Sequence, residues 1–159
     1  MTGLDFAIKM ELDGEKYYLE QAEKNQSNRL NTVFKMLAAE EKNHAELLKN
    51  KAENLPYVLY NTYSEYKNLF QEVGDYQNII KDIPDALDLY QKSLKMEKES
   101  IALYRDFLAK ASDDNDKELF QYIIEQEEDH VALLDNLTEL LNRPNDWVES
   151  AEFGLRTEY

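Results

Sequence analysis

The sequence predicts an all-α protein, and more narrowly a four-helix bundle. Its 159 residues suffice for one domain with a sizeable core. Only 4 Gly and 3 Pro are present, so little of the chain suits the turns that a β-sheet needs. Apolar residues recur every three or four positions, the spacing that places side chains on one face of a helix. An internal repeat supports the same fold.

The two halves of the chain align without a gap at an offset of 86 residues. Between residues 9–50 and 95–136, 11 aligned positions are identical. The segment "FKMLAAEEKNHAELLKN" at 34–50 aligns with "FQYIIEQEEDHVALLDN" at 120–136, so the two histidines of the chain coincide. We therefore expect two copies of one helical hairpin.

The first copy, residues 1–54, divides into two helices. Thr2 and Asp5 have the spacing of a capping box, so the first helix is expected to begin there and to run to about Asn25. The polar segment "NQSN" predicts a short turn, and a second helix runs to about Glu53. Because the turn is short, the two helices should be antiparallel neighbours.

The second copy, residues 84–143, also divides into two helices. Pro84 suits the first turn of a helix that runs to about Ala111. The turn "SDDND" then leads into a fourth helix that ends before Pro144. The connection between the copies, residues 55–83, is too long for a tight turn and suits a crossover along the bundle.

We therefore expect one bundle domain over residues 1–143 and a C-terminal tail over 144–159. The tail holds the single Trp, Trp147, and nothing in it suggests catalysis.

Composition limits the partners and the location of the protein. The net charge of −15 should repel nucleic acid and anionic lipid, so we expect neither partner. The chain has no cysteine, which excludes disulfides, thiolate zinc sites, iron–sulfur clusters and a cysteine nucleophile. No apolar run approaches the roughly 20 residues of a membrane span, and the chain opens on an amphipathic pattern rather than a signal peptide. We expect a soluble, cytoplasmic protein.

Six ionisable residues interrupt the apolar faces of the predicted helices. In the second helix, Glu41 and His44 continue a series of apolar residues, and the fourth helix repeats this arrangement. The first and third helices contribute one carboxylate each. The set is Glu11, Glu41, His44, Glu97, Glu127 and His130.

Buried carboxylates need compensating positive charge, because each ionised group costs several kcal/mol to bury. Two divalent cations would balance four carboxylates and leave both imidazoles neutral, as metal ligands must be. The alternative is that these are surface residues of glutamate-rich helices, but their shared register argues against it. Carboxylate with imidazole suits iron or manganese, and zinc could occupy the site in a preparation.

Tyr18 and Tyr104 each follow the first glutamate of their repeat by seven residues, on the same helix face. Either tyrosine could hydrogen-bond a ligand carboxylate across the bundle, or simply pack in the core.

At these residues the chain resembles the rubrerythrin-like branch of the ferritin-like superfamily. "MELDGEKYY" and "MEKESIALY" look like its first and third helices, and "EEKNH" and "EEDH" look like its Glu-x-x-His helices. The resemblance, which covers residues 1 to about 143, implies two iron ions per chain. It also implies that Glu41 and Glu127 bridge the ions while the other four ligands are terminal.

Two departures from that branch bear on function. A rubredoxin domain is missing because the chain has no cysteine, so electrons must come from an external donor such as a separate rubredoxin. Ser100 stands where a seventh ligand, an extra glutamate, is usual, and the remaining six are closer to a ferroxidase-type set.

The resemblance thus implies a non-haem di-iron oxidoreductase, a peroxidase of the oxidative-stress response that reduces hydrogen peroxide or dioxygen, in a homodimer. One alternative is a ferroxidase that stores or delivers iron, for which storage requires a large oligomer. The other alternative is a structural bundle stapled by metal.

Overall fold

The computed structural model of the protein describes residues 2–26, 30–60 and 86–142. Within these ranges the chain forms four helices joined by turns and irregular segments and contains no strand, which confirms the predicted all-α four-helix bundle. The tail and most of the crossover lie outside the described residues, and the predicted domain limits stay a prediction. The helices are α1 (Gly3–Lys24), α2 (Leu30–Ala52), α4 (Ala86–Lys110) and α5 (Asp114–Asn142).

The start of α1 forms the predicted capping box. The Thr2 hydroxyl accepts a hydrogen bond from the Asp5 backbone N–H, and the Asp5 carboxylate accepts one from the Thr2 N–H, both at 3.1 Å. These bonds satisfy two backbone donors that the first turn of a helix leaves unpaired. At the other end of α1, the backbone N–H of Asn25 donates to the carbonyl of Ala22.

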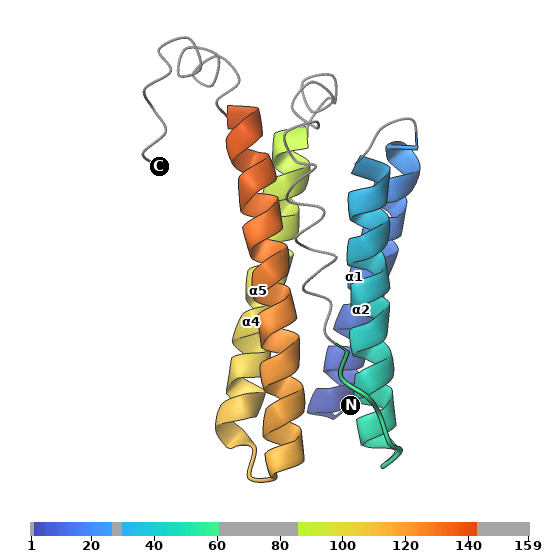
Figure 1. Ribbon diagram of the computed structural model, residues 1–159, viewed down its shortest axis with the longest axis vertical. Coiled ribbons are helices and arrows are strands. Elements are labelled where there is room, and N and C mark those ends of the chain that lie inside the picture. Colours follow the sequence, from blue (N-terminus) through green and yellow to red (C-terminus); the bar gives the residue numbers. More distant parts are fainter. Residues whose placement is uncertain (1, 27–29, 61–85, 143–159) are drawn as a thin grey trace.

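The helices pair as two antiparallel hairpins, α1 with α2 and α4 with α5 (Figure 1). The two hairpins lie side by side, and all four helices run along the long axis of the molecule (Figure 1). Among the described residues, no helix combines the length and the apolar character needed to cross a membrane.

The buried core has an apolar cluster toward each end of the bundle. One contains Tyr18, Phe34 and Tyr90, and the other contains Tyr104 and Phe120. Along every helix, a position with a buried carboxylate separates the residues of one cluster from those of the other. A polar layer therefore crosses the middle of the bundle, and all four helices contribute to it.

Candidate metal centre

The polar layer consists of the six residues that the sequence singles out. Each is fully or almost fully buried, and none is more than 4% exposed. Helices α1 and α4 contribute one carboxylate each, while α2 and α5 contribute a carboxylate and the histidine one turn later. The structure therefore brings together Glu11, Glu41, His44, Glu97, Glu127 and His130.

The layer divides into two overlapping sets of possible ligands. In each set, four residues offer one ligand atom apiece, and these atoms all lie within 4.8 Å of one another. Glu41 and Glu127 belong to both sets, which is the arrangement in which a carboxylate gives one oxygen to each of two ions. The sets are Glu11, Glu41, His44 and Glu127, and Glu41, Glu97, Glu127 and His130.

His44 points its Nδ1 atom into the layer. This nitrogen lies 3.4 Å from Glu11 Oε2 and 3.2 Å from Glu127 Oε1. On the other side of the ring, Nε2 lies 2.5 Å from Oε1 of Gln126, whose amide nitrogen donates to the Tyr122 hydroxyl at 2.8 Å. An amide oxygen only accepts, so Nε2 keeps its hydrogen and Nδ1 is the nitrogen available to a metal.

His130 occupies the equivalent place in the second hairpin. Its Nδ1 atom lies 3.4 Å from Glu41 Oε1 and 3.2 Å from Glu97 Oε1. The two imidazole rings lie 6.2 Å apart between centroids, with 24° between their planes. The repeat position that corresponds to Gln126 is Glu40, a carboxylate that is also buried.

Two tyrosines hold the terminal carboxylates from the opposite hairpin. The Tyr18 hydroxyl donates to Glu97 Oε1 at 2.6 Å, and the Tyr104 hydroxyl donates to Glu11 Oε1 at 2.5 Å. The sequence left open whether these tyrosines bond a carboxylate or pack in the core; in the structure both hydroxyls donate to a carboxylate, and both side chains are fully buried. In Glu11 the other oxygen, Oε2, faces His44, whereas in Glu97 the same oxygen, Oε1, accepts from Tyr18 and lies near His130.

Protons compensate the buried negative charge in the absence of metal. Burial and the neighbouring carboxylates Glu11 and Glu127 raise the pKa of Glu41 well above its usual value. Burial by itself lowers the pKa of His44, but Glu11 and Glu127 raise it overall to about 10. Burial opposes ionisation of Glu127, yet the neighbouring imidazoles of His130 and His44 hold its pKa at about 2. Metal ions would replace these protons as the compensating charge.

The donor atoms of the layer fit two metal ions. Buried polar atoms normally have a hydrogen-bond partner. In the part of the chain that the structure describes, most of the buried side-chain oxygens without one belong to this layer, and two cations would satisfy them together. They are Glu11 Oε2, Glu41 Oε1, Glu97 Oε2 and both oxygens of Glu127.

The sequence did not point to two neighbours of the cluster. Gln126 is a polar residue on a charged helix, and only its contact with His44 across the bundle reveals a role. Gly14 lies so close to the cluster that a Cβ atom there would be 3.0 Å from Glu41 Oε2. The one available signal was the repeat, which aligns Gly14 with Ser100 and Gln126 with Glu40.

A buried layer of four carboxylates and two imidazoles inside four antiparallel helices is the arrangement found in dimetal bundles of the ferritin-like class. Comparison with protein-family models gives a match to Rubrerythrin over residues 3–138, and the chain belongs to this family. Its members are generally di-iron oxidoreductases. Comparisons with curated proteins and with solved structures returned no match.

Proposed function

We propose that the protein is a di-iron oxidoreductase that reduces hydrogen peroxide to water with electrons from a separate donor. The observation that carries the proposal is the sharing of Glu41 and Glu127 between two buried ligand sets. When bound there, two ferrous ions would supply the two electrons that, with two protons, convert one peroxide molecule into two of water.

The residues of the chain have distinct roles in this proposal. Glu41 and Glu127 would hold both metals, and one histidine and one terminal glutamate would complete the ligands of each. The terminal ligands are Glu11 with His44, and Glu97 with His130. Tyr18 and Tyr104 orient the terminal carboxylates through their hydrogen bonds, which is the usual task of residues just outside the ligand set.

The electron donor must reach the protein from outside. The chain has no cysteine and therefore no rubredoxin-type centre of its own, so a separate rubredoxin is the donor we propose. The same proposal places the protein in the cytoplasm as a homodimer that protects against peroxide.

Stopped-flow absorption tests the proposal. Anaerobic protein carrying two ferrous ions per chain is mixed with hydrogen peroxide or with dioxygen, and the ferric absorbance is followed. We expect peroxide to oxidise the iron much faster than dioxygen, and reduced rubredoxin to reverse the oxidation.

The matched variants are Glu127→Ala and Glu125→Ala, because Glu125 is an exposed glutamate on the same helix. Only Glu127→Ala should abolish the reaction. Faster oxidation by dioxygen, followed by uptake of iron beyond two ions per chain, would overturn the peroxidase in favour of a ferroxidase that stores iron.

A further inference from the structure

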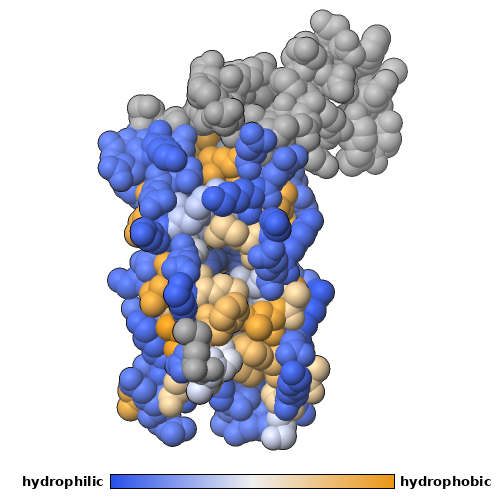
Figure 2. Space-filling model, turned by 180° about the vertical axis from the view of Figure 1, so that it is seen from behind, coloured by the Kyte–Doolittle hydropathy of each residue, from blue (hydrophilic) through white to orange (hydrophobic). Residues whose placement is uncertain are grey.

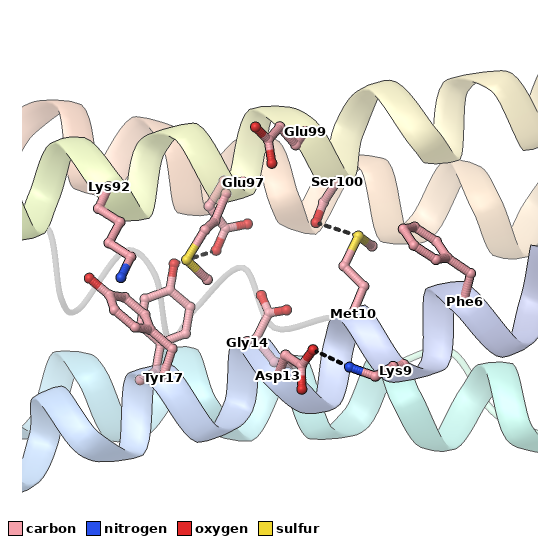
Figure 3. Close-up of a pocket in the computed structure, with 13 residues that line it drawn as sticks. Phe6, Lys9, Met10, Asp13, Gly14, Tyr17, Lys92, Glu97, Glu99 and Ser100 are labelled. Carbon is pink, nitrogen blue, oxygen red and sulfur yellow. Dashed lines mark hydrogen bonds and ion pairs between the residues drawn. The ribbon is translucent and has the colours of Figure 1, made fainter.

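A cavity of about 410 Å³ lies between α1 and α4, directly beside the candidate metal centre (Figure 3). Glu41 and Glu97 of the centre form part of its wall. Hydrogen peroxide has two heavy atoms, and a single water takes up roughly 30 Å³ in the liquid. The cavity is thus far larger than peroxide requires, and its size is typical of sites for small organic molecules, roughly 300–1,000 Å³.

The wall of the cavity is largely apolar. Met10 and Met96, which the repeat relates, come from the two facing helices, and Phe6 and Tyr17 add aromatic rings. Figure 2, which shows the molecule from the side of α1 and α4, has apolar side chains along the middle of this face and hydrophilic ones on both flanks. Methionine adapts to irregular apolar shapes and makes favourable contacts with aromatic rings.

Two small residues keep the space beside the centre open. Gly14 and Ser100 occupy equivalent repeat positions, three residues after the terminal glutamates of α1 and α4, and both line the cavity. At Gly14 a Cβ atom would press on Glu41 Oε2, and Ser100 turns its hydroxyl toward Met10 Sδ, 3.6 Å away (Figure 3). A long side chain at either position would occupy the space next to the metal ligands.

The two lysines of the cavity are engaged with other groups. Lys9 forms an ion pair with Asp13 at 3.1 Å, and the ammonium of Lys92 lies 5.0 Å from the centre of the Tyr17 ring (Figure 3). With both lysines so engaged, the cavity suits a neutral ligand better than a carboxylate or a phosphate.

We propose that this cavity binds neutral organic hydroperoxides, R–OOH with an apolar R group, and directs their O–O bond to the metal centre. The inference rests on the proposed function, which supplies the two electrons. The O–O bond breaks, and with two electrons and two protons R–OOH becomes the alcohol R–OH and water. The apolar group then lies against Met10, Met96 and the aromatic rings.

Binding can be tested without metal or turnover. Protein with ¹³C-labelled methionine methyl groups is titrated with cumyl alcohol, the neutral product of cumene hydroperoxide reduction. Met10 and Met96 report on the cavity, and Met36 of α2 serves as the internal control because it packs against an apolar core cluster. We expect saturable shifts at Met10 and Met96 only. No shift, or equal shifts at all three, would overturn the inference.

A matched pair of variants tests the link to substrate choice. Ser100→Leu fills the cavity, whereas Ala102→Leu adds the same group to an exposed position of the same helix. In ferrous-loaded protein, Ser100→Leu should lower the ratio of oxidation rates, cumene hydroperoxide over hydrogen peroxide, at least tenfold, while Ala102→Leu leaves it unchanged. An unchanged ratio in Ser100→Leu would contradict the inference.

The two proposals fail separately. Oxidation by hydrogen peroxide without methionine shifts overturns the cavity assignment alone. Methionine shifts without oxidation by any peroxide overturn the proposed function and leave the organic site standing.

Discussion

The two hairpins carry the same ligands in the same register, yet the residues around those ligands differ. Both contribute a terminal glutamate, a shared glutamate and a histidine at positions 86 residues apart. Beside the ligands, Gln126 of the second hairpin corresponds to Glu40 of the first, and Ser100 corresponds to Gly14. The repeat therefore places the same candidate metal ligands in both hairpins, while the unequal neighbours make the surroundings of the two ligand sets different.

The difference at Gln126 and Glu40 bears directly on the histidines. Gln126 accepts from Nε2 of His44, whereas Glu40 is a buried carboxylate at the matching place in the other hairpin. A buried carboxylate and a neutral amide at equivalent positions, each directly before a shared glutamate, give the two ligand sets different electrostatic surroundings. The two metal positions should thus differ in affinity although their ligands are the same.

The largest loss of metal affinity is expected for a glutamate that both ligand sets share. Glu127→Ala removes a ligand from both sets, so we expect both tight metal sites to be lost, each weakened by more than about 100-fold. Glu11→Ala removes a ligand from one set and should leave one tight site. Calorimetric titration of metal-free protein with zinc counts the sites. A tight site that survives Glu127→Ala would show that the carboxylate is not shared.

A smaller change should weaken one position alone. Gln126→Leu removes the acceptor that holds His44, and we expect a loss of about 10–100-fold in affinity at one of the two sites. Gln121→Leu, an exposed glutamine on the same helix, is the control and should change neither site. Equal weakening of both sites by Gln126→Leu would show that Gln126 does not act on the His44 site alone.

The contrast between Gly14 and Ser100 predicts a still smaller effect. Gly14→Ala places a Cβ atom 3.0 Å from Glu41 Oε2, so the carboxylate must shift and zinc should bind severalfold more weakly. Ser100→Ala keeps the existing Cβ atom and should bind zinc like the wild type. The same calorimetric titration measures both variants, and equal affinities would show that Glu41 tolerates the contact.

The smallest expected effect lies far from the metals, in the cap of the first hairpin. Hydrogen bonds from the Thr2 backbone and hydroxyl lower the pKa of Asp5, so its ionised form stabilises the folded state. This stabilisation is present above the unfolded pKa of 3.8 and is lost as the pH falls through the lower folded value.

Asp5→Ala should therefore lower the melting temperature slightly at pH 6, and the difference from wild type should shrink below pH 3.8. Thermal melts at several pH values measure this, with Glu20→Ala, an exposed residue of the same helix, as the control. A difference in melting temperature that does not change with pH would show that ionisation of Asp5 does not stabilise the fold.

The features that could be predicted from the sequence are those that depend on register within one helix. Spacing of three and four placed Glu41 and His44 on one face, and the repeat then located their partners in the second hairpin. The repeat also puts Tyr18 and Tyr104 in matching places, but the sequence left open whether they bond a carboxylate across the bundle or pack in the core.

The features that escaped prediction depend on contacts between different helices. Gln126 and His44 are in contact although 82 residues separate them in the sequence, and the spacing of residues within either helix cannot predict such a contact. The role of Gly14 and the cavity beside it depends on how closely α1 approaches its neighbours, which the side chains of several helices determine together. A glycine in a helix is otherwise only a weak helix former.

Anomalous diffraction at the iron edge, from crystals of protein loaded anaerobically with ferrous iron, tests the central claim most directly. We expect two iron peaks per chain, roughly 3.5–4 Å apart, with Glu41 and Glu127 touching both ions. A single peak, or iron bound anywhere other than between these two glutamates, would contradict it.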